Sequence, residues 1–152
     1  PLHSVINYVR ANRADYGTVD IVYGSRSMED LLDLDEIQNE WAKEEGINVH
    51  LTIDRAQDTW PGHVGFVPSY VKELGFDPDK NVLVCGPPIM IKFTLGSLTE
   101  LGFVNTQIYT TMELRMKCGV GKCGRCNIGN KYVCKDGPVF RFDELGELPS
   151  EY

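Results

Sequence analysis

Apolar positions along the first 110 residues follow two patterns that alternate. One recurs every three to four residues, which is typical of helices with one buried face. The other consists of short β-branched runs, which are typical of buried strands. The predicted helices span residues 2–13, 33–45, 67–74 and 88–101, and the predicted strands span residues 18–23, 47–53, 81–85 and 106–110.

Helices that alternate with apolar strands favour right-handed crossovers and a parallel sheet covered on both faces. The predicted fold class is therefore α/β, with a parallel Rossmann-like sheet flanked by helices over residues 1–110. Gly102 is expected to close the last helix as its left-handed C′ residue. No strand precedes the first helix, so we expect a strand and a tight turn before Pro1, in a longer protein of which this chain is a segment.

The second predicted helix is acidic, and its start and buried face can be proposed from its residues. Asp33 or Asp35 is a suitable N-cap because a short carboxylate can accept hydrogen bonds from the first free N–H groups. Ile37, Trp41 and Ala42 share the expected buried face. The segment that follows the next strand is rich in Gly, Pro and polar residues, which predicts a loop over residues 55–66.

The chain changes character after residue 110. Residues 117–138 are dense in Gly and Cys and have neither a helical nor a strand period. They predict a small cysteine-rich subdomain over residues 111–152 whose shape depends on something that links its cysteines. The tail, residues 143–152, is acidic and is expected to be solvated.

Composition excludes several classes of function. The 152 residues carry a net charge of −7, which argues against nucleic-acid binding, since phosphate contacts call for a basic face. An acidic surface instead suits docking to a protein with a basic patch. No apolar run is long enough to span a membrane. Four of the five cysteines crowd together, which favours metal ligation in a reducing compartment over disulfides, with the cytoplasm as the default.

The crowded cysteines carry the strongest chemical signal in the chain. Cys118, Cys123, Cys126 and Cys134 have the spacing C-x4-C-x2-C-x7-C. The first three match the plant-type ferredoxin spacing, in which one loop wraps a [2Fe–2S] cluster and a later Cys completes the second iron. The glycines between them suit a backbone that must approach bridging sulfides closely. These four residues are therefore predicted to hold a [2Fe–2S] cluster that passes single electrons.

Two other uses of the four thiols stay open at this stage. A structural zinc site also uses four thiolates, but its ligands usually come as two short C-x2-C pairs, and only one is present. A non-catalytic adaptor with such a zinc site is the main alternative function. A nucleotide sensor whose clustered thiols form disulfides on oxidation is the other.

Candidate ligand residues also follow three of the predicted strands. In an open α/β sheet, ligands bind beyond the carboxyl ends of the strands, and the next helix N-terminus offers free N–H groups to an anion. Each loop alone is a weak signal, because Gly after a strand is usually a turn and Arg is usually solvated. The residues in these positions are Gly24, Ser25 and Arg26 after the first strand, Asp54 and Arg55 after the second, and Cys85, Gly86, Pro87 and Met90 after the third.

Together these loops resemble the C-terminal NAD(P)-binding domain of the ferredoxin–NADP reductase family. The matching segments are Pro1-Leu2, Tyr23-Gly24-Ser25-Arg26 with Asp30-Leu31-Leu32, Gly65-Phe66-Val67, and Cys85-Gly86-Pro87-Pro88 followed by Met90.

The cysteine region and the segment Cys134–Phe140 narrow the resemblance. They are similar to iron–sulfur reductase subunits from three kinds of enzyme. These are the electron-transfer subunit of dihydroorotate dehydrogenase B, the gamma subunit of sulfhydrogenases and the corresponding subunit of anaerobic sulfite reductase.

The resemblance implies an NAD(P)H-linked oxidoreductase subunit. NAD(P)H would deliver a hydride to FAD, which would release electrons singly to the cluster and on to a catalytic or electron-accepting subunit, or the reverse. Gly86, Pro87 and Met90 would lie at the nicotinamide and diphosphate, with Cys85 near hydride transfer. The remaining cofactor-binding residues that it implies are Pro1, Leu2, Gly24, Ser25, Arg26, Asp54 and Arg55.

Three further expectations follow from the resemblance. The family's FAD-binding domain should precede this segment, so the segment alone is expected to be inactive. Asp54 suits a ribose 2′-hydroxyl and Arg55 a 2′-phosphate, and the second cation at Arg26 favours acceptance of NADP. A hydrogenase or a sulfur-reducing complex is the first-ranked setting, because of the compact gap before Cys134.

Overall fold

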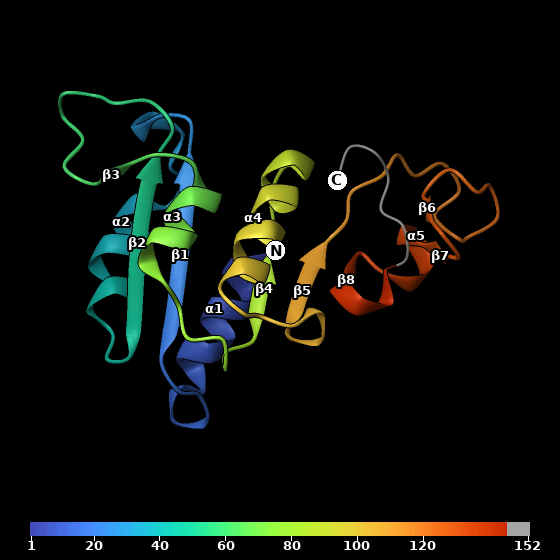
Figure 1. The fold of residues 1–152 in the computed structure, drawn as a ribbon, viewed down its shortest axis with the longest axis horizontal. Coiled ribbons are helices and arrows are strands. Elements are labelled where there is room, and N and C mark those ends of the chain that lie inside the picture. Colours follow the sequence, from blue (N-terminus) through green and yellow to red (C-terminus); the bar gives the residue numbers. More distant parts are fainter. Residues whose placement is uncertain (146–152) are drawn as a thin grey trace. The chain divides into compact units, whose positions relative to one another are not determined.

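The computed structural model describes residues 1–145 and divides the chain into two compact units, Pro1–Leu74 and the part from Gly75 on (Figure 1). Each unit has its own sheet and its own core, and each is described by itself. The helices are α1 (Leu2–Ala11), α2 (Leu34–Asn39), α3 (Val67–Leu74), α4 (Pro88–Glu100) and α5 (Val133–Asp136), and the strands are β1 (Val19–Ser25), β2 (Ile47–Ile53), β3 (His63–Val64), β4 (Val82–Val84), β5 (Ile108–Thr111), β6 (Asn127–Ile128), β7 (Lys131–Tyr132) and β8 (Val139–Arg141).

The first unit is built on a parallel sheet in the order β1-β2-β3. β1 and β2 pair along their whole length, from Val19 opposite Ile47 to Ser25 opposite Ile53. β3 adds two residues beside the end of β2. The parallel pairing places the carboxyl ends of β1 and β2 at the same edge, as the sequence predicted.

Helices lie on both faces of this sheet (Figure 1). α3 packs on the face that carries Gly24, because a side chain at Gly24 would overlap Val67 of α3. Tyr23 points to the opposite face, where its hydroxyl accepts a hydrogen bond from Leu32 N at 3.1 Å. The α/β fold class with a helix-covered parallel sheet is confirmed.

The second unit pairs β4 with β5 in parallel and β5 with β8 antiparallel. β8 follows the cysteine region and was not predicted, since three residues are too few to display a period. β6 and β7 form a separate two-stranded antiparallel pair. Residues 117–138, predicted to have no period, therefore hold only two-residue strands and the one-turn helix α5.

Each unit has a buried apolar core. A fully buried side chain of this kind stabilises the folded state by roughly 1.5–3 kcal/mol. The core of the first unit includes Val9, Leu31, Ile37, Trp41, Ile47, Ile53 and Val71, and that of the second includes Val84, Ile91, Leu95, Leu98, Phe103, Ile108, Met112, Ile128, Val133, Phe140 and Leu145.

Most predicted elements are confirmed within two residues of their ends, but the second helix is wrong in extent. α2 ends at Asn39, a weak helix former, and a short 3-10 helix over Trp41–Lys43 follows. Asp33 occupies the N-cap position, in the left-handed conformation with φ of 55°, without a side-chain cap bond. Trp41 is buried as expected, whereas Ala42 is exposed. The break in the helix is what turns Ala42 away from the core.

The C-terminus of α4 has the predicted left-handed glycine. Gly102 has φ of 94°, and its N–H bonds to Thr99 O at 3.0 Å while Phe103 N bonds to Leu98 O at 3.0 Å. This pair of bonds is the Schellman arrangement, and Leu98 and Phe103 are both buried beside it.

Two further sequence predictions meet the structure only in part. The loop predicted over residues 55–66 contains β3. In the predicted tail, Asp143 and Glu144 are exposed, but Leu145 is buried. The rest of the tail, residues 146–152, lies outside the described residues. Among the described helices, none combines the length and the apolar character that a membrane span needs.

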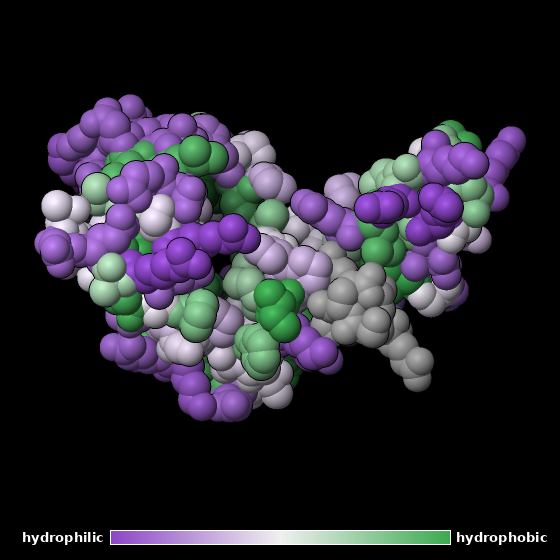
Figure 2. Space-filling model, turned by 90° about the horizontal axis from the view of Figure 1, so that it is seen from above, coloured by the Kyte–Doolittle hydropathy of each residue, from purple (hydrophilic) through white to green (hydrophobic). Residues whose placement is uncertain are grey.

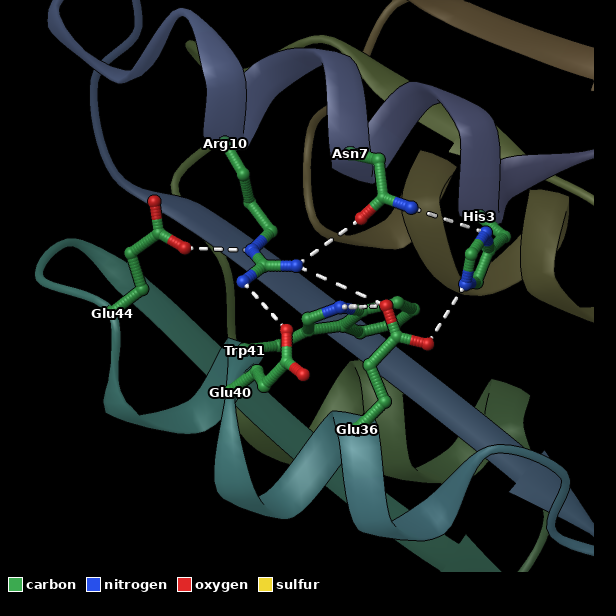
Figure 3. Close-up of polar contacts among 7 residues, drawn as sticks. All are labelled: His3, Asn7, Arg10, Glu36, Glu40, Trp41 and Glu44. Carbon is green, nitrogen blue, oxygen red and sulfur yellow. Dashed lines mark hydrogen bonds and ion pairs between the residues drawn. The ribbon is translucent and has the colours of Figure 1, made fainter.

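An arginine links α1 to α2 and to the turn that follows it (Figure 3). Arg10 Nε donates to Glu44 at 2.7 Å, and Nη2 donates to Glu40 at 3.1 Å. The hydrogen bond to Glu44 is the main reason that the pKa of Arg10 is raised. Glu36 completes the group, because it accepts from the Trp41 indole at 3.1 Å and pairs with His3 at 3.0 Å. These contacts fix the first helix over the second.

Replacing Arg10 with Ala should destabilise the full-length protein by about 1–2 kcal/mol, because two close ion pairs and a largely buried aliphatic stem are lost. Lys43→Ala, at an exposed lysine in the turn that follows α2, is the matched control and should change stability by less than about 0.5 kcal/mol. Urea unfolding at low and high salt would measure both. Equal effects of the two substitutions would contradict the role assigned to Arg10.

Candidate functional site

The carboxyl ends of β1 and β2 bring together five of the predicted nucleotide-binding residues. Ser25 lies opposite Ile53 in the last register pair, and Asp54 N donates to Ser25 O at 2.9 Å. Arg26 and Arg55 follow directly, so two cations leave adjacent strands at one edge. Parallel pairing is what makes residues 29 positions apart neighbours here.

Gly24 has a packing role that the sequence did not indicate. A Cβ at this position would overlap Val67 Cγ2 and lie 3.0 Å from Thr52 Cγ2. The absent side chain therefore lets the first turn of α3 rest on β1. The close approach that Gly24 permits is therefore made by helix α3 of the protein itself.

Two polar residues fix the loop after β1. Ser25 Oγ donates to Ser27 O at 2.5 Å, so the hydroxyl is engaged in the turn. Gln57 accepts from Met28 N at 2.6 Å and donates to the Glu29 carboxylate at 3.0 Å, which joins the loop after β2 to the loop after β1. The hydrogen bond from Gln57 is the main cause that lowers the pKa of Glu29.

Sequence reasoning missed Gln57, because a single Gln in a polar loop carries no pattern. Only its position opposite residues 28 and 29 shows that it joins the two loops.

Arg26 and Arg55, in the same two loops, are both exposed, and no ion pair forms at either of them within residues 1–145. Their guanidinium groups are available to an anion.

The loop after β4, in the second unit, holds the other predicted nucleotide-binding residues. Cys85 is half-buried just beyond the end of the strand. Pro88 opens α4, whose first turn carries Met90, and the Met90 side chain lies over Gly86, where a Cβ would overlap it. Thr94 donates to Met90 Sδ at 3.2 Å, which holds this side chain in place.

Pro1 and Leu2, the first two of the predicted nucleotide-binding residues, lie at the start of α1. Pro1 is exposed and occupies the N-cap position of α1, which begins at Leu2. They belong to the first unit, as does the pair of strand ends with Arg26 and Arg55. The predicted roles of all these residues in nucleotide binding stay predictions.

The cysteine loop is shaped by backbone N–H groups that point at sulfur. Lys122 N and Cys123 N donate to Cys118 Sγ at 3.3 and 3.4 Å, and Gly121 N donates to Cys134 Sγ at 3.2 Å. Gly121 has a positive φ of 71°, which lets the chain turn tightly enough to aim these donors. The loop therefore presents positive backbone dipoles to its sulfurs.

The four thiols lie near one another in this loop, and none of them is in a disulfide. Cys118 lies within hydrogen-bonding reach of Cys123, and Cys134 lies within reach of Cys126 and close enough to Cys118 to be affected by its charge. Backbone N–H donors, that of Val120 foremost, lower the pKa of Cys118 to about 6. The hydrogen bond that the Cys134 thiol donates to Cys126 is the main cause that raises the pKa of Cys134. A thiolate is thus favoured at Cys118 even without a metal.

This donor set fits a [2Fe–2S] centre. In such a cluster four cysteine thiolates serve two irons, so each iron takes two thiolates and the bridging sulfides supply the rest. Within the described residues no three His, Cys, Asp or Glu side chains converge as a ready-made site for one ion. Cys126 is 2% exposed whereas Cys123 is exposed, so these two thiols differ in their access to solvent.

Two family descriptions match successive parts of the chain. Residues 1–95 match the oxidoreductase NAD-binding domain, and residues 113–146 match the iron–sulfur cluster binding domain of dihydroorotate dehydrogenase B. The boundary between them agrees with the change of character seen in the sequence, although the division into residues 1–110 and 111–152 stays a prediction.

The chain is also similar to named proteins. It is 36% identical to sulfhydrogenase 1 subunit gamma of Pyrococcus furiosus, over 98% of this chain and 53% of that subunit. It is 33% identical to a probable dihydroorotate dehydrogenase B (NAD(+)) electron transfer subunit of Thermococcus kodakarensis, over 91% of this chain and 53% of that subunit. The chain therefore spans about half the length of these curated relatives.

Solved structures agree with the fold. The ferredoxin reductase in carbazole 1,9a-dioxygenase matches with a TM-score of 0.56 and 25% identity, over 67% of this chain and 31% of that one. The cytochrome b5 reductase domain of Ulva prolifera nitrate reductase matches with a TM-score of 0.63 and 24% identity, over 71% of this chain and 42% of that one. The second likeness bears on the fold alone.

Proposed function

The chain belongs to the oxidoreductase NAD-binding domain family, and on that premise we propose that it is part of an electron-transfer subunit. The whole protein would exchange electrons between NAD(P)H, FAD and a partner redox subunit, with a [2Fe–2S] cluster held by this segment. The observation that carries the proposal is a loop with four neighbouring thiols, in which backbone N–H groups donate to the sulfurs of Cys118 and Cys134.

In the proposed site Cys118, Cys123, Cys126 and Cys134 hold the cluster. A bound cluster supplies one-electron chemistry that a nicotinamide, which moves hydride, cannot supply by itself. The chain's own contribution is electrostatic: the N–H groups of Gly121, Lys122 and Cys123 stabilise negative charge on sulfur. Cys126, which is buried, would keep one side of the site away from water.

We propose that the residues after β4, in the second unit, receive the nicotinamide and the diphosphate. The Met90 side chain lies over Gly86, the N-terminus of α4 offers N–H groups, and Cys85 would lie near the reacting carbon. The residues after β1 and β2 would face the adenosine ribose. Arg26 and Arg55 are exposed and free of ion pairs among the described residues, which supports acceptance of a 2′-phosphate and hence of NADP.

The partner and the setting are also proposals. The similarity to a sulfhydrogenase gamma subunit supports a hydrogenase or a sulfur-reducing complex as the destination of the electrons. The five cysteines are free thiols, which suits a reducing compartment, so we propose the cytoplasm.

Metal analysis of protein prepared without oxygen tests the cluster directly. We expect iron and acid-labile sulfide in about a 1:1 ratio, as a [2Fe–2S] cluster requires, with visible absorption that dithionite bleaches. Tightly bound zinc without sulfide would instead support the adaptor alternative, and bare thiols that pair on oxidation would support the sensor.

A second prediction separates reduction of the flavin from electron transfer through the cluster. Cys126→Ser in the full-length protein should abolish electron transfer to an external acceptor, because a buried cluster ligand is lost. Reduction of the flavin by NAD(P)H should stay within about twofold, since the nucleotide loops do not contain this residue. Stopped-flow absorbance would follow both steps. Cys85→Ser serves as the contrast, because it is expected to slow flavin reduction. Equal loss of flavin reduction and of electron transfer in Cys126→Ser would contradict the separate roles of the two regions.

Cofactor preference can be tested at the strand ends. Arg55→Ala should raise the KM for NADPH by about tenfold, the loss expected when one charge-assisted hydrogen bond to a phosphate is removed, and should leave that for NADH nearly unchanged. Lys43→Ala, which removes an exposed cation elsewhere on the first unit, is the control. An equal effect on NADH and NADPH would show that Arg55 does not bind the 2′-phosphate.

A further inference from the structure

The charges of this chain are distributed very unevenly. The cysteine segment, residues 113–137, holds six Lys and Arg but only two Asp and Glu, a net charge of +4. The remaining residues hold nine Lys and Arg and twenty Asp and Glu, a net charge of −11. The total of −7 therefore conceals a basic cysteine segment. The six cations are Arg115, Lys117, Lys122, Arg125, Lys131 and Lys135.

These cations are accessible to another molecule. Five are exposed and Lys131 is half-buried, and within the described residues none of the six takes part in an ion pair. The two carboxylates of the segment, Glu113 and Asp136, offset only two of the six positive charges, and Asp136 accepts a hydrogen bond from Tyr132 N at 2.7 Å. Lys135 lies across the loop, since a Cβ at Gly121 would come within 3.2 Å of its Cδ.

Apolar side chains lie among the cations. Val120 is 61% exposed and stands in the same loop as Lys122, and Met116 is 50% exposed next to Lys117. In Figure 2 the part of the chain with β6, β7 and α5 shows hydrophilic and hydrophobic residues side by side. An apolar centre with a charged rim is the usual composition of a protein-binding surface.

The exposed thiol lies within this surface. Cys123 is exposed and Lys122 and Val120 precede it, whereas Cys126 is buried. A bound [2Fe–2S] cluster with four thiolates has a formal charge of about −2 when oxidised, which is smaller than the +4 of the segment. The surface stays positive with the cluster in place.

From these observations we propose that the cysteine segment docks an acidic face of the protein with which it exchanges electrons. The inference rests on the proposed electron-transfer function and gives the partner its chemistry. We define the docking surface as the six cations of the segment together with the exposed side chains of Val120 and Cys123. Its sign is opposite to the one that the net charge of the chain suggested, because a partner meets the local field at the cluster and distant charges are screened over about 10 Å.

The apolar centre favours a protein over other polyanions. A nucleic acid would meet the cations but would leave Val120 and Met116 exposed. It would also gain nothing from a position beside Cys123, whereas electron exchange requires close approach to the cluster. A second redox protein uses both the charge and the apolar contact.

The test uses the full-length holoprotein and a small acidic [2Fe–2S] ferredoxin as the probe. Stopped-flow absorbance would follow electron exchange, and calorimetry would follow binding, from about 20 to about 500 mM ionic strength. We expect the rate constant to fall about tenfold over this range, as for oppositely charged partners. The double variant Lys117→Gln/Lys122→Gln should lower both the rate and the affinity at least about threefold at low salt and little at high salt.

Lys43→Gln/Lys92→Gln is the matched control, because it removes the same charge from exposed lysines outside the segment and should leave both readouts unchanged. A rate that rises with salt, or equal effects of the two double variants, would overturn the proposal. Stronger binding of anionic phosphatidylglycerol vesicles or of duplex DNA than of the ferredoxin, lost in Lys117→Gln/Lys122→Gln, would also overturn it.

A separate measurement distinguishes this proposal from the proposed function. Reduction of the cluster by NAD(P)H in the absence of any probe reports on the internal relay alone. If that reduction fails, the electron-transfer function is wrong whatever the ferredoxin does. If it succeeds while docking ignores the charges of the segment, only the docking surface is wrong. Iron content and circular dichroism of each variant establish that the fold and the cluster are intact.

Discussion

Two sulfur atoms of the cysteine loop, those of Cys118 and Cys134, accept hydrogen bonds from backbone N–H groups, and the chemistry proposed for this chain depends on that arrangement. A thiolate is costly to hold without hydrogen-bond donors, and donors on the backbone do not titrate or move away. Gly121 adopts the left-handed conformation that a tight turn requires, and the N–H groups of Lys122 and Cys123 then point at Cys118. These N–H groups, together with that of Val120, which has the largest effect, lower the pKa of Cys118, so the loop is already suited to a thiolate-bound metal centre.

The nucleotide-binding half follows a different physical rule. Its candidate residues lie in short loops, and the rigid elements behind those loops fix them. Parallel pairing of β1 and β2 places Arg26 beside Asp54 and Arg55, and Gln57 then joins the two loops through Met28 and Glu29. Gly24 contributes by letting α3 pack on the sheet. The positions of these loops are thus set by the packing of the strands and of α3.

Charge is divided between the two halves in a way that suits their proposed tasks. The NAD-binding part carries the excess of acidic residues, and there Arg10 shows how a cation is used internally, with both of its short contacts to glutamates. In the cysteine segment the cations have no such partners among the described residues. Net charge describes solubility and long-range behaviour, but recognition at a cluster is set by the charges within a Debye length of it.

The sequence by itself determined the alternation of α1 to α4 with β1, β2, β4 and β5, the parallel α/β class, the left-handed glycine at residue 102 and the identity of the cysteine centre's candidate ligands. Hydrophobic period, turn residues and cysteine spacing are local signals, and each is complete within a few residues. Tertiary structure alone decided that β8 completes the second sheet and that Gly24 makes room for Val67. It also decided that Cys134 lies beside Gly121 and Cys126. These facts depend on which distant residues come into contact, and no local pattern contains that information.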